Sequence, residues 1–150
     1  DRIVLWKAAV DMTLESPLLG KGFKAFRLLK SDYTERPVPV SDTHNMYLFI
    51  SSQMGIPALI LFILIIYKLY SMSAFLVSHS RDEFVRAIGI GGAAMAGSVA
   101  AVNVFGSRMV NIEVCGYFWI YLAVIMHLIY KFKNNNQQIN ENEKIRYPTQ

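Results

Sequence analysis

Three long stretches of the chain contain no acidic or basic residue and are dominated by apolar side chains. They are 25, 21 and 17 residues long and cover residues 43–67, 87–107 and 114–130. A helix needs about 20 apolar residues to cross a bilayer, and about 17 is the short limit. The pattern therefore predicts three transmembrane helices, over about residues 45–70, 87–107 and 113–130.

A polar segment, residues 1–43, precedes these stretches and holds seven Lys/Arg and six Asp/Glu. A helix is expected over residues 1–14, because apolar residues recur there at spacings of three and four. The stripe consists of Ile3, Trp6, Val10 and Leu14. Gly20 and Gly22 then predict a flexible turn, and residues 23–30 are expected to form a short basic helix.

The first apolar stretch is uneven along its length. Its beginning contains Ser51, Ser52 and Gln53, whereas residues 58–67 are entirely apolar. We therefore expect the polar half to face protein or a wet cavity rather than lipid. Two further features are expected: Asp42 or Thr43 caps the helix, and Pro57, which follows Gly55, kinks it.

The second stretch is rich in glycine and alanine. Small residues recur every four positions, which allows neighbouring helices to approach closely. The two rows are Gly89/Ala93/Gly97/Ala101 and Gly92/Ala96. We interpret them as a packing seam rather than a transport pathway. Aromatic residues are frequent in the third stretch, as is typical near membrane interfaces.

The composition supports a membrane protein, since 53% of the residues are hydrophobic and 17% are charged, against about 25% charged in an average soluble domain. A soluble helical protein is the alternative, but 150 residues cannot cover helices that are apolar on every face. The fold class expected is therefore an all-α integral membrane protein, in which an outer-side helical segment precedes three transmembrane helices.

Basic residues in the short connections predict the orientation, because they favour the cytoplasmic side. The loop 68–86 carries Lys68, Arg81 and Arg86, and the region after the third stretch carries Lys131 and Lys133. Residues 1–43 and the turn before the third stretch should then lie outside. We expect residues 131–150 to form a disordered cytoplasmic tail.

Candidate chemistry concentrates in the outer segment. Arg2 and Trp6 share a helix face, Lys24 and Arg27 belong to a basic cluster after the glycine turn, and His44 stands where the segment enters the membrane. Guanidinium groups suit phosphates, although basic residues at a membrane surface also bind lipid headgroups. A neutral histidine can act as a general base, with a capping or interfacial histidine as the alternative.

Other chemistries find little support in the sequence. His127 lies in the third stretch, where an ionisable residue can be functional, but it is close to the cytoplasmic end. Cys115 is the single cysteine, so no disulfide framework is possible. No metal-ligand spacing and no phosphate-binding loop are present. We expect no metal, no cofactor and no nucleic-acid partner.

The outer segment and the first span resemble a known family. Arg2-x-x-x-Trp6, then "SPLLGKGFKAF", then His44-Asn45 and nine residues before Gly55 resemble the C-terminal half of the O-antigen ligase and polymerase superfamily. The resemblance covers roughly residues 2–125. Ala58 stands where ligases commonly carry another glycine, so ligase and polymerase both stay open.

This resemblance implies a multi-span protein of the bacterial inner membrane with a large periplasmic or extracellular loop. Such proteins transfer a glycan, without a metal, from an undecaprenyl-diphosphate donor to a sugar hydroxyl on a lipid A core, another repeat unit or a protein. Carried over, Arg2 would hold the diphosphate and His44 would activate or orient the acceptor. Asn45, Lys24, Arg27 and Arg108 are expected to bind substrate.

Two further expectations complete the interpretation. The family carries an earlier arginine and earlier spans, so we expect further chain before residue 1 and no activity from these 150 residues alone. The alternatives to a glycan transferase are a transporter or flippase-like protein, with a path past His127, and a non-catalytic assembly subunit that binds membrane lipids.

Overall fold

The computed structural model describes residues 2–34, 38–39 and 42–146, with side chains described as far as residue 134. The described residues form helices and no strand. In chain order the elements are α1 (Arg2–Glu15), α2 (Ala25–Leu29), the 3-10 helix η1 (Lys30–Tyr33), α3 (Met46–His79), α4 (Glu83–Val102), the 3-10 helix η2 (Arg108–Val110) and α5 (Ile112–Arg146). This confirms the all-α class.

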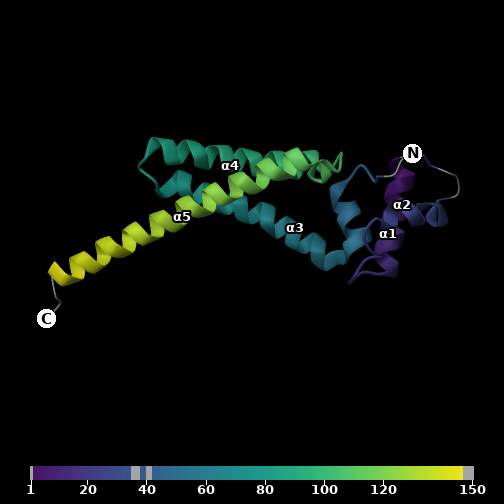
Figure 1. Ribbon diagram of the computed structural model, residues 1–150, viewed down its shortest axis with the longest axis horizontal. Coiled ribbons are helices and arrows are strands. Elements are labelled where there is room, and N and C mark those ends of the chain that lie inside the picture. The colour runs from purple at the N-terminus through teal and green to yellow at the C-terminus, as the bar shows by residue number, and fades with distance from the viewer. Residues whose placement is uncertain (1, 35–37, 40–41, 147–150) are drawn as a thin grey trace.

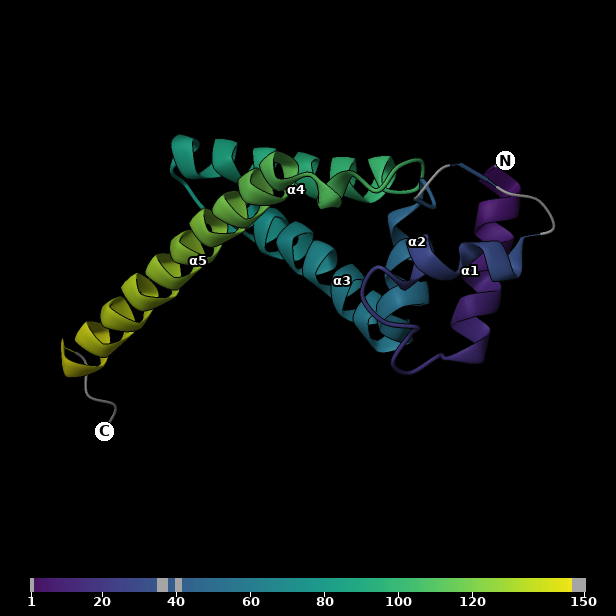
Figure 2. The same ribbon diagram turned by 45° about the vertical axis from the view of Figure 1, so that its right-hand side comes forward.

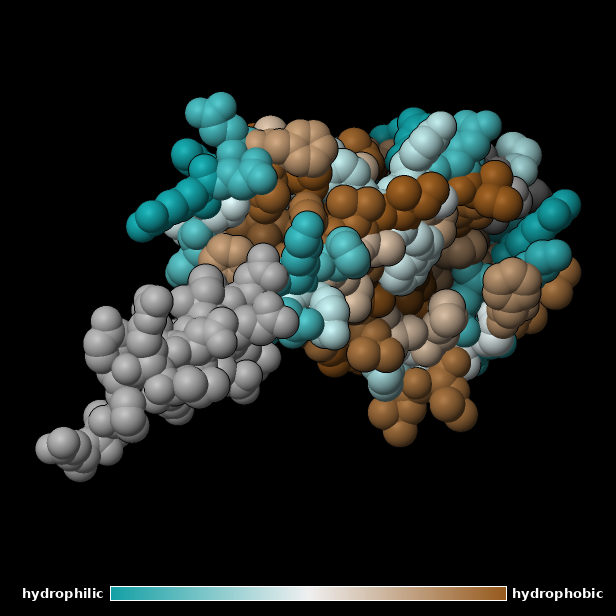
Figure 3. Space-filling model, turned by 60° about the vertical axis from the view of Figure 1, so that its left-hand side comes forward, coloured by the Kyte–Doolittle hydropathy of each residue, from teal (hydrophilic) through white to brown (hydrophobic). Residues whose placement is uncertain are grey.

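The long helices α3, α4 and α5 form an elongated bundle, and α1 and α2 lie together at one end of it (Figure 1, Figure 2). We call residues 2–34 the head. The turn between α3 and α4 lies at the opposite end of the bundle. Three helices are long and apolar enough to cross a membrane: Met46–His79, Glu83–Val102 and Ile112–Asn134. Figure 3 shows the corresponding apolar surface between two hydrophilic ends.

Helix α3 is broken at Gly55, where the backbone adopts φ 83° and ψ 173°. The break divides it into a short half-helix (46–54) and a long half-helix (56–79). The long half is about 36 Å long at ~1.5 Å per residue, enough to cross a hydrocarbon core of about 30 Å. The expected kink is therefore real, but it is centred on Gly55 rather than on Pro57, because the non-helical backbone there is open only to glycine.

The loop 16–22, which we call the docked loop, repairs the broken helix. The amide of Ile56 donates to the Pro17 carbonyl at 2.7 Å. The amides of Lys21 and Gly22 donate to the carbonyls of Ser52 and Gln53 at 2.9 and 3.0 Å. Backbone groups that a break releases must find partners where water is scarce. The docked loop supplies them from the head.

The polar residues of the short half-helix face protein, as expected. Ser51, Ser52 and Gln53 are all buried, and the Ser51 hydroxyl lies 3.1 Å from the hydroxyl of Thr13 on α1. The expected helix cap was wrong. Asn45 caps α3, because its side-chain oxygen accepts from the amides of Tyr47 and Leu48 at 3.0 and 3.1 Å.

The stripe expected on α1 was also wrong. Ile3 and Leu14 are 80% and 72% exposed. The buried face packs around Phe26 of α2 and comprises Leu5, Ala8, Ala9 and Met12. Apolar residues occupy several faces of α1, so periodicity alone does not select the one that packs. The face that packs is the one turned toward α3 and η1 as well as toward Phe26.

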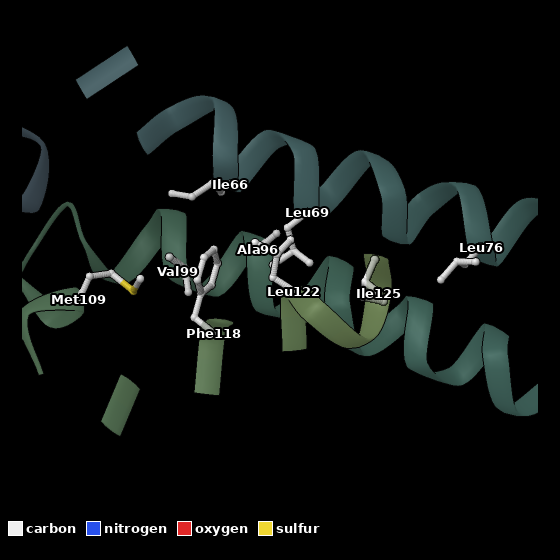
Figure 4. Close-up of a cluster of buried hydrophobic side chains, with 9 residues drawn as sticks. All are labelled: Ile66, Leu69, Leu76, Ala96, Val99, Met109, Phe118, Leu122 and Ile125. Atoms are coloured by element: carbon white, nitrogen blue, oxygen red, sulfur yellow. The ribbon is translucent and has the colours of Figure 1, made fainter. Parts of the chain in front are cut away.

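One of the two expected small-residue rows forms the seam between α3 and α4. Gly92 and Ala96 are buried, together with Gly89, whereas Gly97 is exposed. A side chain on Gly89 would meet the Ser73 carbonyl oxygen at 2.9 Å. The core shared by the three long helices is shown in Figure 4 and comprises Ile66, Leu69, Leu76, Ala96, Val99, Met109, Phe118, Leu122 and Ile125.

The bounds of the spans differ from expectation. α4 begins at Glu83, where the Asp82 carboxylate caps it, and ends at Val102 rather than at 107. α5 continues to Arg146, whereas the sequence predicts a disordered tail from residue 131. No Pro or Gly occurs between 117 and 147, and a helix that is already nucleated extends at little cost.

Candidate functional site

The segment 42–45 joins the head to α3 and is held from three sides. The indole nitrogen of Trp6 donates to the Thr43 carbonyl at 2.9 Å. The Ser107 hydroxyl donates to Asp42 at 2.7 Å, and the Met46 amide donates to the Asn103 carbonyl at 2.8 Å. The segment is thus fixed between α1 and the turn that joins α4 to α5.

His44 occupies the centre of this segment in a left-handed conformation, with φ 51°. Its neighbours Thr43 and Asn45 are 0% and 8% exposed, whereas His44 itself is half-buried. The Thr43 hydroxyl lies between the amide and the carbonyl of Asn45, accepting at 3.2 Å and donating at 2.7 Å. Rigid flanking residues therefore present an accessible imidazole.

Asn45 has a structural role, as the N-cap of α3, that was not expected from the sequence. Its side-chain oxygen is used by the two amides at the start of α3, and the residue is buried. This oxygen stabilises the helix end, as Asn commonly does at this position. Its substrate role, expected from the resemblance, gains no support from these contacts.

Arg2 and Arg108 approach the same segment through their neighbours. Arg2 is exposed and lies one helical turn before Trp6, on the same face of α1. Arg108 is exposed as well and follows Ser107, which binds Asp42. Arg2 and Arg108 therefore neighbour, along the chain, the two side chains that anchor the His44 segment.

Lys24 and Arg27 line a different feature, a groove of about 460 Å³ between α2 and the short half-helix. We call it the α2–α3 groove. Its lining is mostly apolar and comprises Phe23, Lys24, Arg27, Met46, Phe49, Ile50, Gln53, Met54 and Val110. Neither Arg2, His44 nor Arg108 is among these residues. The structure therefore separates the expected substrate-binding residues into two groups.

A charged cluster on the head anchors the docked loop. Lys21 and Tyr33 both donate to the Glu15 carboxylate, at 2.5 and 2.6 Å. The hydrogen bond from Lys21 lowers the pKa of Glu15, and the Glu15 carboxylate raises the pKa of Lys21 and of Tyr33. The ion pair is exposed, so its contribution to stability is small.

The described residues contain no group of three or more His, Cys, Asp or Glu that could hold a metal ion. His127 is exposed on α5. Cys115 is half-buried and accepts from the Trp119 indole at 3.2 Å. The structure thus gathers no second set of reactive groups around either residue.

The head and the broken helix have a counterpart among known protein families. Residues 1–63 match the O-antigen ligase family model. The matched part contains α1, α2, the 42–45 segment and the start of the long half-helix. It therefore includes the docked loop and Gly55, and the resemblance expected from the sequence is confirmed over this range. Searches of curated proteins and of solved structures found no match.

Two residues that hold the 42–45 segment in place were not expected from the sequence. Asn103 is 0% exposed; its side chain donates to Val99 and accepts from Met109, and its carbonyl holds Met46. Its position as an asparagine inside the apolar run "AAVNVF" could have indicated a buried, hydrogen-bonded side chain. Ser107 gave no signal, because its partner Asp42 lies 65 residues away.

Proposed function

We propose that this protein is a membrane glycan transferase that moves a glycan from an undecaprenyl-diphosphate donor to a sugar hydroxyl in surface polysaccharide synthesis. The O-antigen ligase match over residues 1–63 supports the glycosyltransferase class. The observation that carries the proposal is the 42–45 segment, in which a half-buried His44 is held between the Trp6 and Ser107 anchors. Arg2 lies one helical turn before Trp6, and Arg108 follows Ser107 in the chain.

In this proposal His44 accepts the proton of the acceptor hydroxyl or orients that hydroxyl toward the donor. Arg2 and Arg108 stabilise the negative charge that develops on the departing diphosphate, which fixed guanidinium groups do well. Thr43 and Asn45 hold the imidazole in place. Lys24 and Arg27 line the α2–α3 groove instead, and we do not assign them to the donor site.

The proposal also assigns an orientation. The head and His44 face the periplasmic or extracellular side of the bacterial inner membrane, and the α3–α4 turn faces the cytoplasm. Residues Arg81 and Arg86 at that turn support this assignment. The acceptor is a lipid A core for a ligase and a growing glycan for a polymerase.

The test replaces His44 in the intact gene of the source organism and examines surface polysaccharide on a gel. His44→Asn is the sharper variant, because Asn tolerates the left-handed conformation that Ala does not. We expect His44→Asn and Arg2→Ala to abolish long-chain glycan while protein abundance is retained. His79→Ala and Lys7→Ala are the matched controls and should leave the ladder intact.

The pattern of loss distinguishes the two activities. A collapse of the ladder to single repeat units indicates a polymerase, and loss of every repeat from the acceptor indicates a ligase. An unchanged ladder in the His44→Asn strain, with the deletion strain defective, would disprove the role of His44. An unchanged ladder in the deletion strain as well would disprove the function.

A further inference from the structure

The α2–α3 groove combines features that suit an anionic lipid. Its walls are the apolar side chains of Phe49, Ile50 and Met54, and its cations are Lys24 and Arg27. No carboxylate is among the nine lining residues. A hydrocarbon chain and a phosphate would therefore each find a complementary surface within one groove.

The groove also lies at the level where a lipid headgroup belongs. One wall is the short half-helix, which begins where Met46 bonds the Asn103 carbonyl just beyond the end of α4. Another part of the lining is Val110 of η2, at the same end of the bundle. The groove thus stands at the boundary between the apolar bundle and the polar head.

Gln53 adds an independent observation. Its side chain is 3% exposed and lines the groove, yet its amide oxygen has no hydrogen-bond partner among the described residues. A buried polar atom without a partner is costly. A ligand that carries hydroxyl donors would satisfy it.

Lys24 is held in an uncommon conformation at the same place. Its backbone is left-handed, with φ 62°, and its ammonium lies 5.7 Å from the centre of the Phe23 ring. Phe23 is 83% exposed. Phe23 and Lys24 therefore present an aromatic ring and a cation side by side in the groove lining.

We propose that the α2–α3 groove binds one phosphatidylglycerol-type phospholipid of the surrounding bilayer. A hydrocarbon chain lies along the short half-helix, the phosphate contacts Lys24 and Arg27, and a glycerol hydroxyl of the headgroup donates to Gln53. We favour a bilayer phospholipid over the glycan donor because Arg2 and Arg108, the residues assigned to the donor diphosphate, lie outside the groove lining. Bulk phospholipid is also present around the groove in large excess, which favours its occupancy by mass action.

The bound lipid stabilises the docked loop. Gly22 donates to the backbone carbonyl of Gln53, and Lys24 follows only two residues later. A lipid that joins Lys24 to the short half-helix therefore ties the end of the docked loop to the broken helix. This role is independent of the proposed glycan transfer.

The experiment is native mass spectrometry of the intact protein, released from nanodiscs that contain equal amounts of phosphatidylglycerol and phosphatidylcholine. We expect one retained phosphatidylglycerol, enriched over phosphatidylcholine by on the order of ten-fold through the two basic groups. The double variant Lys24→Ala/Arg27→Ala should lose the enrichment. The double variant Lys24→Arg/Arg27→Lys should keep it, as should Lys7→Ala, which removes a basic residue elsewhere on the head.

A second variant tests the groove itself rather than its charges. Val110→Glu places a carboxylate in the lining at a position that is 58% exposed, and it should abolish lipid retention without unfolding the protein.

Equal retention of both lipids by the wild-type protein would overturn the proposal, as would unchanged enrichment in the double alanine variant. Displacement of phosphatidylglycerol by a lower concentration of undecaprenyl phosphate would show that the groove belongs to the donor instead. His44→Asn should retain the lipid even where it abolishes glycan transfer, which separates the two proposals.

Discussion

Gly55 and Leu18 touch backbone to backbone: a methyl group on Gly55 would lie 2.6 Å from the carbonyl carbon of Leu18. Gly20 makes the reciprocal approach, since its methyl group would lie 2.5 Å from the Gln53 carbonyl oxygen. The docked loop and the broken helix therefore fit only because both sides lack a side chain. The break in α3 and the conformation of the loop depend on each other.

Gly55→Ala should lower the stability of the protein by at least about 3 kcal/mol, through backbone strain and the loss of the docked loop's hydrogen bonds. Thermal unfolding in detergent measures the change. Gly22→Ala is the graded control, because Gly22 has φ 101° but open space around it, so only strain remains. Gly97→Ala, in open space on α4, should have no destabilising effect. Equal losses for Gly55→Ala and Gly97→Ala would contradict the docking.

Trp6→Phe should reduce glycan transfer more than it reduces stability. The substitution keeps an aromatic ring but removes the donor to Thr43, which costs about 0.5–1.5 kcal/mol and frees the backbone next to His44. Surface polysaccharide and protein abundance are measured in the same strain. Trp119→Phe, which removes a comparable indole donor on α5, should leave transfer at its wild-type level. If the two variants behave alike, the Trp6 hydrogen bond does not position His44.

The docked loop should loosen in acid. The pKa of Glu15 is lowered below its ordinary 4.5 by Lys21 and Tyr33. The stability that the ionised carboxylate contributes is therefore complete above pH 4.5, and it is lost as the pH falls through the lowered pKa of the folded protein. The raised pKa of Lys21 contributes stability below about 10.5 that is lost at higher pH. Hydrogen-exchange protection of the loop amides, followed as a function of pH, measures both the loss in acid and the loss at high pH. Glu15→Gln should abolish the loss of protection in acid, whereas Asp11→Asn should preserve it.

Gly89→Leu should separate α4 from α3, because even a methyl group at Gly89 would lie 2.9 Å from the Ser73 carbonyl oxygen. We expect a loss of about 2 kcal/mol or more, the range of overpacked cores. Tm in detergent reports the change. Gly97→Leu introduces the same side chain eight residues later on α4, at an exposed position with open space around it. A loss for Gly97→Leu as large as that for Gly89→Leu would contradict the close packing of α4 against α3 at Gly89.

The pattern of apolar and polar residues along the chain was enough to predict the number and the class of the long helices. Charge-free runs of about 20 residues leave a helix that crosses a membrane as the stable option, since every backbone group must be bonded internally. The same reasoning located α1, the glycine turn and the basic segment after it. The pair His44-Asn45 and the spacing to Gly55 also pointed to the family whose model matches residues 1–63.

The packed face of each element and the partners of each polar residue could be learned only from the folded protein. The buried face of α1 is set by its packing against α3, η1 and the cluster around Phe26 rather than by the apolar stripe read from its spacing. Asn45 caps α3, Ser107 anchors Asp42, and Lys24 and Arg27 line a groove apart from Arg2. These outcomes depend on contacts between residues that are far apart in the chain, and local periodicity, charge and propensity carry no information about such contacts.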